Sequence, residues 1–168
     1  MNIEEALTQF AQGKFVIITD DESRENEGDL MLLAELANPE SIGFMVRYTS
    51  GVICVALTQE IAHNLQLPPM VRRNQDERRT AYTVSVDAAE GLTTGISAEE
   101  RARTVNRLAD SHARPADFIR PGHVFPLVAH ADLFASRQGH TEAGVAMAQL
   151  VGATPATAIS EIVLDDGS

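Results

Sequence analysis

An acidic stretch near the amino terminus, ITDDESRENEGDLMLLAE at residues 18–35, holds the residue types most able to do chemistry. If its RENEGD segment is extended, Glu25, Glu27 and Asp29 point the same way, because side chains alternate along a strand. Carboxylates on one face repel one another unless a hard cation or a proton-transfer role holds them together. The pattern indicates either a metal-facing edge or a solvated turn between two strands. Six acids fall within ten residues here: Asp20, Asp21, Glu22, Glu25, Glu27 and Asp29.

A second candidate is RQGHTEA at residues 137–143, where Gly139 and His140 lead into a predicted helix that starts at Thr141. The free backbone N–H groups of such a helix end bind phosphate readily, and Arg137 could add a bidentate contact. His140 could bind a metal or move a proton. The same residues also fit an ordinary capped helix start.

Further polar residues stand at element ends or inside apolar strands. The hydroxyl-rich GLTTGIS segment, which contains Thr94, precedes another predicted helix, and His123 follows a Pro-Gly turn, a place typical of a structural histidine. Cys54 lies in an apolar strand, where a buried inert thiol is usual. Glu161 lies in AISEIVL, so its carboxylate must be paired, protonated or part of a site.

Hydrophobic periodicity and capping residues predict the elements that position these groups. Predicted helices cover the segment from Ile3 to a stop at Gly13 and residues 40–49, 59–66, 98–110 and 141–152. Predicted strands cover residues 14–20, 29–35, 50–58, 80–88, 118–130 and 157–164. Strands and helices do not alternate strictly, which favours an α+β fold: a single-domain, layered αβα architecture with a mixed β-sheet.

Composition narrows the class of protein. A chain of 168 residues that is 44% hydrophobic suits one domain with one core. The net charge of -11 argues against nucleic acid or an anionic membrane as a partner. The sequence contains no apolar run of about 18 residues and no signal-peptide pattern, so we expect no membrane span. A single cysteine suits a reducing cytoplasm.

Six segments, which cover nearly the whole chain in order, resemble the 3,4-dihydroxy-2-butanone 4-phosphate synthase family of riboflavin biosynthesis. They are DDESRENEGDLMLLAE, RYTSGVICVALT, YTVSVDAAEGLTTGISAEERARTV, DFIRPGHVFPL, RQGHTEAGVAMAQLVG and ISEIV. The resemblance implies a lyase that converts D-ribulose 5-phosphate into 3,4-dihydroxy-2-butanone 4-phosphate and formate. It also implies a Mg²⁺ or Mn²⁺ cofactor and a homodimer with active sites at the subunit interface.

The resemblance further implies which residues bind metal and substrate. Glu25 and His140 would bind the metal, with Glu27 close to the metal and its waters. Arg24 and Asp29 would contact the sugar phosphate, and Thr94 would reach the substrate from its own or the partner subunit. The implied substrate-binding residues are Arg24, Glu25, Asp29, Thr94, Arg137, Gly139, His140, Thr141 and Glu161, of which Arg137, Gly139 and Thr141 would hold the phosphate.

The implied chemistry explains why so many carboxylates are present. A divalent ion chelated by a ketose carbonyl and its neighbouring hydroxyl acidifies the adjacent C–H. A carboxylate base, Asp29 or Glu161, would then take the proton. The residues implied in catalysis are Glu27, Asp29, Cys54, His123 and Glu161.

Two features depart from the family pattern. Family members usually continue for tens of residues after the LDDG-type segment, so we expect residues 1–168 to be one domain shortened at its C-terminus. The loop RRNQDERR, implied to cover the substrate, ends in Arg79 where the family usually has glycine. An impaired sugar-phosphate-binding relative and an acidic metal-binding domain are therefore the alternative hypotheses.

Overall fold

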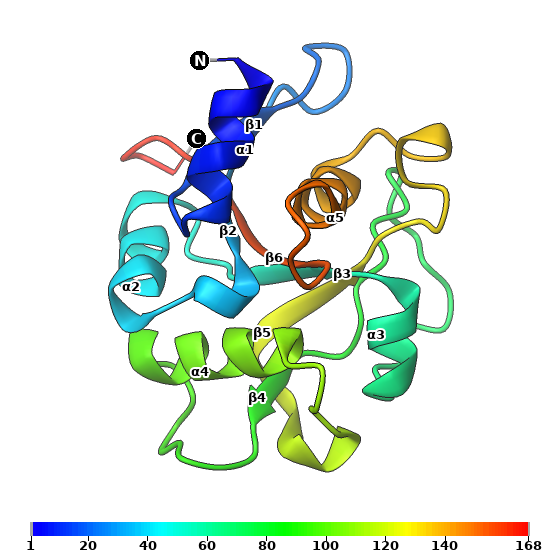
Figure 1. The fold of residues 1–168 in the computed structure, drawn as a ribbon. Helices are drawn as coiled ribbons and strands as arrows, with labels where there is room; N and C mark the ends of the chain where they lie inside the picture. Colours follow the sequence, from blue (N-terminus) through cyan, green and yellow to red (C-terminus); the bar gives the residue numbers. More distant parts are fainter. Residues whose placement is uncertain (1, 168) are drawn as a thin grey trace.

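The computed structural model describes residues 2–167, which form one six-stranded sheet with helices on both faces (Figure 1). The strands are β1 (Val16–Thr19), β2 (Gly28–Leu33), β3 (Cys54–Leu57), β4 (Val86–Ala88), β5 (Phe118–Val128) and β6 (Ala156–Glu161). The helices are α1 (Ile3–Ala11), α2 (Pro39–Tyr48), α3 (Gln59–Asn64), α4 (Ala98–Ala109) and α5 (His140–Leu150). Three 3-10 turns are η1 (Ala34–Leu36), η2 (Pro115–Asp117) and η3 (Leu133–Ala135).

The sheet is mixed, as the sequence predicts. Its strand order is β1-β2-β6-β3-β5-β4. The pair β3·β5 is parallel, whereas β1·β2, β2·β6, β3·β6 and β4·β5 are antiparallel. Chain order and strand order therefore differ, and strands distant in sequence meet at the centre of the sheet. The α+β prediction is confirmed.

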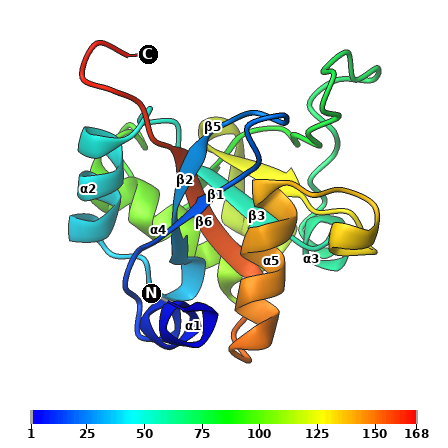
Figure 2. The same ribbon diagram turned by 90° about the horizontal axis from the view of Figure 1, so that it is seen from above.

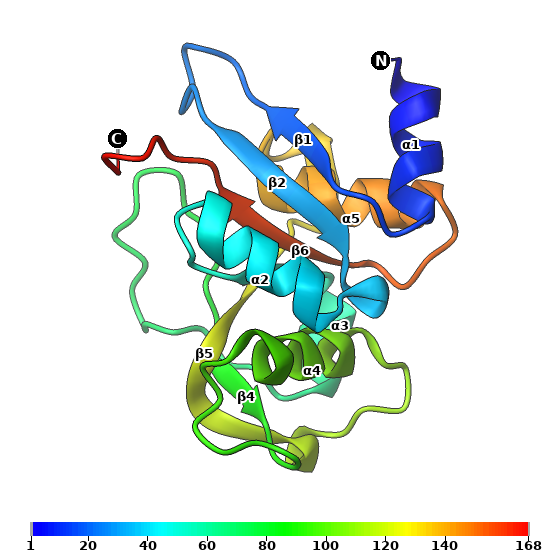
Figure 3. The same ribbon diagram turned by 90° about the vertical axis from the view of Figure 1, so that its left-hand side faces the viewer.

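Two apolar layers hold the helices against the sheet. Leu30 and Leu32 of β2 belong to a cluster that includes Ile42 of α2 and Val105 of α4. Figure 3 shows α2 and α4 on the same side of the sheet. The alternate residues, Met31 among them, belong to a second cluster that includes residues of α1 and α5. Figure 2 shows these two helices next to each other. Because both faces of β2 are buried, the strand reads as one continuous apolar run rather than an alternating one. Truncating a fully buried leucine typically costs about 2–5 kcal/mol.

Local sequence signals account for the helix starts. Asn38 caps α2 and Ser97 caps α4, each through a reciprocal capping box. Thr58 caps α3 by accepting the N–H of Ile61. Gly144 lets α5 approach the sheet, since a Cβ there would lie 3.1 Å from the Cβ of Thr157. That close contact fixes α5 over the central strands.

The predicted elements are present, but their boundaries differ from the observed ones, and two of these differences affect the region of the candidate site. Residues 80–88 are predicted as one strand, but β4 covers only the last three of them. Tyr82 and Thr83 form isolated bridges instead, and the register with β5 shifts between Val86 and Asp87, so no continuous ladder forms. Helix α5 begins at His140 rather than Thr141, with Gly139 as its N-cap. Within residues 2–167, no helix combines the length and apolar character needed to cross a bilayer.

Candidate active site

A cavity of about 180 Å³ lies between the β1–β2 turn, the start of α5 and the segment around Thr80. Asp29 enters it from β2, Cys54 from β3 and Glu161 from the last position of β6. Most of the residues implied by the family resemblance meet here: Arg24, Glu25, Glu27, Asp29, Cys54, Arg137, His140, Thr141 and Glu161. Gly139 lies at its edge as the N-cap of α5.

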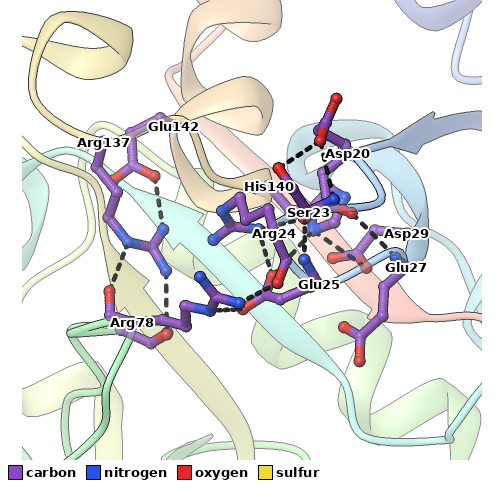
Figure 4. Close-up of polar contacts among 12 residues, drawn as sticks. Asp20, Ser23, Arg24, Glu25, Glu27, Asp29, Arg78, Arg137, His140 and Glu142 are labelled. Atoms are coloured by element: carbon purple, nitrogen blue, oxygen red, sulfur yellow. Dashed lines mark hydrogen bonds and ion pairs between the residues drawn. The ribbon is translucent and has the colours of Figure 1, made fainter.

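Three side chains in this region can hold one metal ion. Asp20, Glu25 and His140 each offer a ligand atom, and these atoms all lie within 4.8 Å of one another (Figure 4). We call these three residues the metal cluster. Oxygen and imidazole ligands suit a divalent cation. Glu25 and His140 are predicted from the sequence, whereas Asp20 is a member that the sequence reasoning missed.

The acidic loop is folded rather than extended, so strand alternation does not apply to Glu25 and Glu27, although both line the cavity together with Asp29. The Asp20 carboxylate accepts the backbone N–H groups of Glu25 and Glu27, at 3.2 and 2.9 Å. Asn26 adopts a left-handed conformation with φ of 56°. The chain therefore curls around Asp20, which turns Glu25 toward His140 and leaves Glu27 exposed at the rim. An acid directly after a strand, and so fixed in place, is the signal that would have identified Asp20.

The cations and hydrogen bonds of this loop keep Asp20 ionised. Partial desolvation opposes ionisation, but the N–H of Glu27, the Arg24 side chain and the N–H of Glu25 outweigh it and lower the pKa of Asp20 to about 2. The Arg24 guanidinium lies 2.7 Å from Asp20 Oδ2 and also contacts the Glu25 carboxylate closely. Arg24 thus balances two acids of the metal cluster while lining the cavity.

The pKa of Asp29 is raised, whereas that of Asp20 is lowered. It pairs with Glu161 across β2 and β6, so two carboxylates lie side by side at the end of the sheet. Burial, followed by the charges of Glu161 and Glu27, raises the pKa of Asp29 to about 7. A carboxyl group with such a pKa exchanges its proton near neutral pH, as a general base must.

Two buried polar atoms in the cavity fit a bound cation. Asp29 Oδ1 and His140 Nε2 are both buried and make no hydrogen bond to any described residue. Buried polar atoms normally have partners, so unsatisfied ones need an explanation. Burial lowers the pKa of His140, which favours the neutral imidazole that coordinates metals. The donor set therefore fits a divalent ion.

The start of α5, at one end of the cavity, combines a helix N-terminus with the side chain of Arg137. Arg137 is held by three groups: Glu142 Oε2 at 2.7 Å, Thr80 Oγ1 at 3.0 Å and the Arg78 carbonyl at 3.1 Å (Figure 4). A Cβ at Gly139 would lie 2.1 Å from Arg137 Nη1, so only glycine leaves room for this arrangement. A fixed guanidinium beside a helix N-terminus suits a phosphate group.

The loop of residues 72–79 is docked over the cavity. Arg78 donates a close hydrogen bond to the Arg24 carbonyl, and its Nε lies 3.9 Å from Glu25 Oε1. These contacts connect the loop to the metal cluster. Nothing in the sequence pattern singles out Arg78, because its partners lie more than fifty positions away.

Replacing Arg79 by glycine is expected to stabilise the protein slightly. Arg79 is exposed and has φ of 57°, a left-handed conformation that costs a non-glycine residue about 1–2 kcal/mol. Glycine also gives the unfolded chain more conformational freedom, which cancels about 0.5–1 kcal/mol of this stabilisation. The net gain in the free energy of unfolding is therefore about 0.5 kcal/mol. Urea unfolding measures the change. Glu77→Gly, in the same loop without a positive φ, is the control and should not stabilise; a less stable Arg79→Gly variant would contradict the argument.

Thr94 and His123 do not line the cavity. His123 lies on β5, where its Nδ1 is 2.7 Å from Asp87 Oδ2 of β4, and the neighbouring Gly95 packs against both side chains. In the strand order, β6 and β3 separate β5 from β2, which carries Asp29. The residues that the family resemblance groups together thus form two separate groups within one chain.

The fold and the metal cluster define an α+β domain in which residues able to hold a divalent cation share a cavity with the basic start of α5. The family model of 3,4-dihydroxy-2-butanone 4-phosphate synthase matches residues 4–168. The chain belongs to that family.

Relatives of this chain differ in length. A 3,4-dihydroxy-2-butanone 4-phosphate synthase of Candida albicans is 51% identical over 164 residues, which are 98% of this chain and 80% of that protein. The riboflavin biosynthesis protein RibBA of Salinispora arenicola is 53% identical over 166 residues, or 99% of this chain, but the chain spans only 40% of that relative. A crystal structure of 3,4-dihydroxy-2-butanone 4-phosphate synthase in complex with two magnesium ions has a TM-score of 0.97 at 51% identity. The match covers 98% of this chain and 77% of that one.

Proposed function

We propose that this protein converts D-ribulose 5-phosphate into 3,4-dihydroxy-2-butanone 4-phosphate and formate, with Mg²⁺ or Mn²⁺ as its cofactor. One observation carries the proposal: the metal cluster shares a cavity with a carboxylate pair, Asp29 and Glu161, and with the arginine-backed start of α5. Family membership and the magnesium-containing relative support the same conclusion. The single cysteine suits a reducing compartment, so we place the reaction in the cytoplasm.

The metal ligands that we propose are Glu25 and His140, with Asp20 beside them. A bound divalent ion would act as a Lewis acid on the carbonyl and adjacent hydroxyl of the ketose. Glu27, exposed at the rim, is placed to contact water on the metal side of the cavity. His140 supplies its lone pair because burial keeps the imidazole neutral.

Asp29 is the base that we propose for the carbon-bound proton next to the substrate carbonyl. Its raised pKa suits proton uptake near neutral pH, and its Oδ1 accepts no hydrogen bond from the described residues, with His140 Nδ1 3.6 Å away. Glu161 lies beside it and accepts the Ser50 hydroxyl at 3.0 Å, which leaves its other oxygen available for a second proton movement. Burial raises the pKa of the Cys54 thiol to about 12, so Cys54 stays protonated and forms part of the wall near the substrate.

The phosphate would bind at the opposite end of the cavity. Gly139 and Thr141 supply backbone N–H groups at the start of α5, and Arg137 supplies the charge. Glu142 is only 1% exposed and keeps the Arg137 guanidinium in place. Arg24, at the metal end, would contact the substrate between the two.

We further propose that a second copy of the chain completes the site with His123 and Thr94. These residues lie outside the cavity of their own chain, which is small beside the roughly 300–1,000 Å³ usual for ligand sites. Apolar side chains are exposed on segments next to the elements that carry these groups: Val52 before β3, Ile96 two residues after Thr94, Ile119 on β5 and Ile162 after β6. A homodimer would bury these side chains and bring the two groups together.

Mixing two inactive variants tests the shared site. Glu25→Ala and His123→Ala alter different groups, so a mixed dimer would contain one site with neither substitution. With random exchange of subunits, activity should recover to about one quarter of wild type. The measurement is formate release after the subunits are unfolded and refolded together, with each variant refolded alone as the control. A mixture no more active than its components would contradict the shared site.

The activity itself is tested by formate release from D-ribulose 5-phosphate. The protein, stripped of metal with EDTA, should be inactive and should regain activity with Mg²⁺ or Mn²⁺. No formate with either ion would overturn the proposal. Binding of ribulose 5-phosphate in calorimetry without formate release would instead support a sugar-phosphate-binding relative, an alternative favoured by the Arg78 contacts that dock the loop over the cavity.

A further inference from the structure

We propose that Glu100 is a positioning residue for the reaction: its carboxylate holds the segment of residues 93–97 in the shape that lets Thr94 reach the substrate. We call this segment the threonine loop. The inference rests on the proposed function, because it concerns how Thr94 is prepared for its role there. Glu100 is not among the site residues that the sequence and the family resemblance indicate. By its place in the sequence it belongs to the capping box that starts α4 at Ser97.

The Glu100 carboxylate accepts four hydrogen bonds from the threonine loop. Oε1 accepts the hydroxyl of Thr93 at 2.8 Å and, more closely, the backbone N–H of the same residue. Oε2 accepts the N–H groups of Gly95 and Ser97, at 3.2 and 3.3 Å. A capping box requires only the bond to Ser97. The three additional donors belong to the residues on either side of Thr94, so one side chain fixes the backbone before and after it.

The two adjacent threonines of the loop differ in their contacts. Thr93 uses its hydroxyl to bond to Glu100. Thr94 is exposed, and its hydroxyl makes no hydrogen bond to any residue from 2 to 167. Loop hydroxyls commonly bond to nearby backbone groups, which holds them inside the loop. The hydroxyl of Thr94 therefore remains available to a ligand, while its neighbours keep its backbone in place.

Glu100 stands on a part of the fold that is itself well fixed. The residue is 8% exposed. Thr104, one turn further along α4, donates to the Glu100 carbonyl at 3.1 Å and accepts the N–H of Ala88 in β4 at 3.0 Å. On the other side of the loop, a Cβ at Gly95 would lie 2.9 Å from Nδ1 of His123. The threonine loop is thus confined between α4 and the histidine that we propose for the same site, as a precise binding group requires.

The chemistry of these bonds calls for a carboxylate. The N–H and then the hydroxyl of Thr93 outweigh desolvation and lower the pKa of Glu100 to about 2, so the group is ionised at any pH near neutrality. An ionised carboxylate has two acceptor oxygens and no donor, which matches four donors arranged around it. An amide has one acceptor oxygen and one NH₂ donor. Glutamine can therefore satisfy one side of this arrangement but not both.

The Glu100→Gln variant separates positioning from capping. Glutamine also serves in capping boxes, so its carbonyl oxygen can accept the N–H of Ser97. Its NH₂ group then meets the donors of Thr93 and cannot accept from them. We expect KM for ribulose 5-phosphate to rise about tenfold, with kcat within about threefold, because Thr94 would contribute a binding contact and no proton transfer. Glu100→Asp keeps two acceptor oxygens and should recover part of the affinity.

Glu99→Gln is the matched control. Glu99 precedes Glu100 on α4, is exposed and forms an ion pair with Arg103 at 3.6 Å. Its replacement removes the same charge from the same helix turn, so KM should stay within about twofold of wild type. The effect of Glu100→Gln should disappear in a Thr94→Ala background, because a positioning residue has no effect without the residue it positions. An unchanged KM in Glu100→Gln or in Thr94→Ala, or equal losses in both backgrounds, overturns the proposal.

Amide hydrogen exchange gives a readout that needs no turnover. The N–H of Thr93 should exchange at least about tenfold faster in Glu100→Gln than in wild type, whereas the N–H of Ser97 should keep its protection. Unchanged exchange at Thr93 overturns the proposal. So does lost protection along the whole of α4, since it would assign Glu100 to the stability of the helix. If wild type releases no formate, the proposed function fails, and exchange alone decides whether Glu100 holds the threonine loop.

Discussion

Replacing Glu25 by alanine is expected to lower kcat/KM at least about 1,000-fold and to weaken Mn²⁺ binding severely, because the metal cluster loses one of its three ligands. Folding should not suffer. The variant loses the contacts of Glu25 with Arg24 and Arg78, but Arg24 keeps its ion pair with Asp20. The Glu25 charge also contributes to the raised pKa values of Glu27 and Asp29. Removing the carboxylate thus relieves repulsion in the metal-free protein. Calorimetric titration with Mn²⁺, steady-state kinetics and urea unfolding measure the three effects.

Glu22→Ala is the matched control for this experiment. Glu22 belongs to the same acidic loop but is exposed and lies outside the metal cluster. Its replacement changes the net charge by the same amount, so screening and long-range electrostatics are equal in the two variants. If both variants lost activity equally, the loss would follow from charge and not from metal ligation.

Asp29→Asn is expected to abolish turnover and, in the metal-free protein, to increase stability at alkaline pH. The pKa of Asp29 is about 7 in the folded chain, above its ordinary value of 3.8. Between these two values the folded state binds more protons than the unfolded state, so the wild-type protein loses stability as pH rises through this window. Asparagine removes that loss. The gain at about pH 8 should be on the order of 1–3 kcal/mol, and it should vanish near pH 4.

Urea unfolding in EDTA at several pH values checks this prediction, with formate release as the second measurement. Glu22→Gln neutralises an exposed acid and should show no such pH-dependent gain. An Asp29→Asn variant that is less stable than wild type at pH 8 would contradict the prediction. It would show that the ionised Asp29 carboxylate stabilises the folded protein. A stabilised but inactive variant would show that the site keeps its base at the expense of stability.

The parts of the fold that depend on neighbouring residues were predictable. The N-cap at Asn38, the capping box at Ser97 and the apolar run of β2 each depend on a few adjacent residues. The sequence alone does not show contacts between residues that are far apart along the chain. The left-handed Asn26 and the hydrogen bonds to Asp20 break the expected alternation of the acidic loop, and the strand order separates His123 from Asp29.

Arg24 has more partners in the folded chain than its place in the sequence indicates. In the sequence it is the lone cation among six acids and, by resemblance, a substrate contact. In the fold it pairs with Asp20 and Glu25 and its carbonyl receives Arg78. One residue therefore connects the acidic loop, the metal cluster and the loop above the cavity. Such a role depends on three segments that meet only in the folded chain.

The backbone bonds to Asp20 have a consequence for cation affinity. The Glu25 and Glu27 amides are satisfied by a carboxylate of the protein itself, so the curve of this loop does not need an ion to hold it. Ordering a residue costs about 1–2 kcal/mol of conformational entropy. In this loop, the entropy cost of ordering the backbone is part of folding and does not have to be met when an ion binds. The loop is preorganised, and more of the ion's interaction energy remains available as binding affinity.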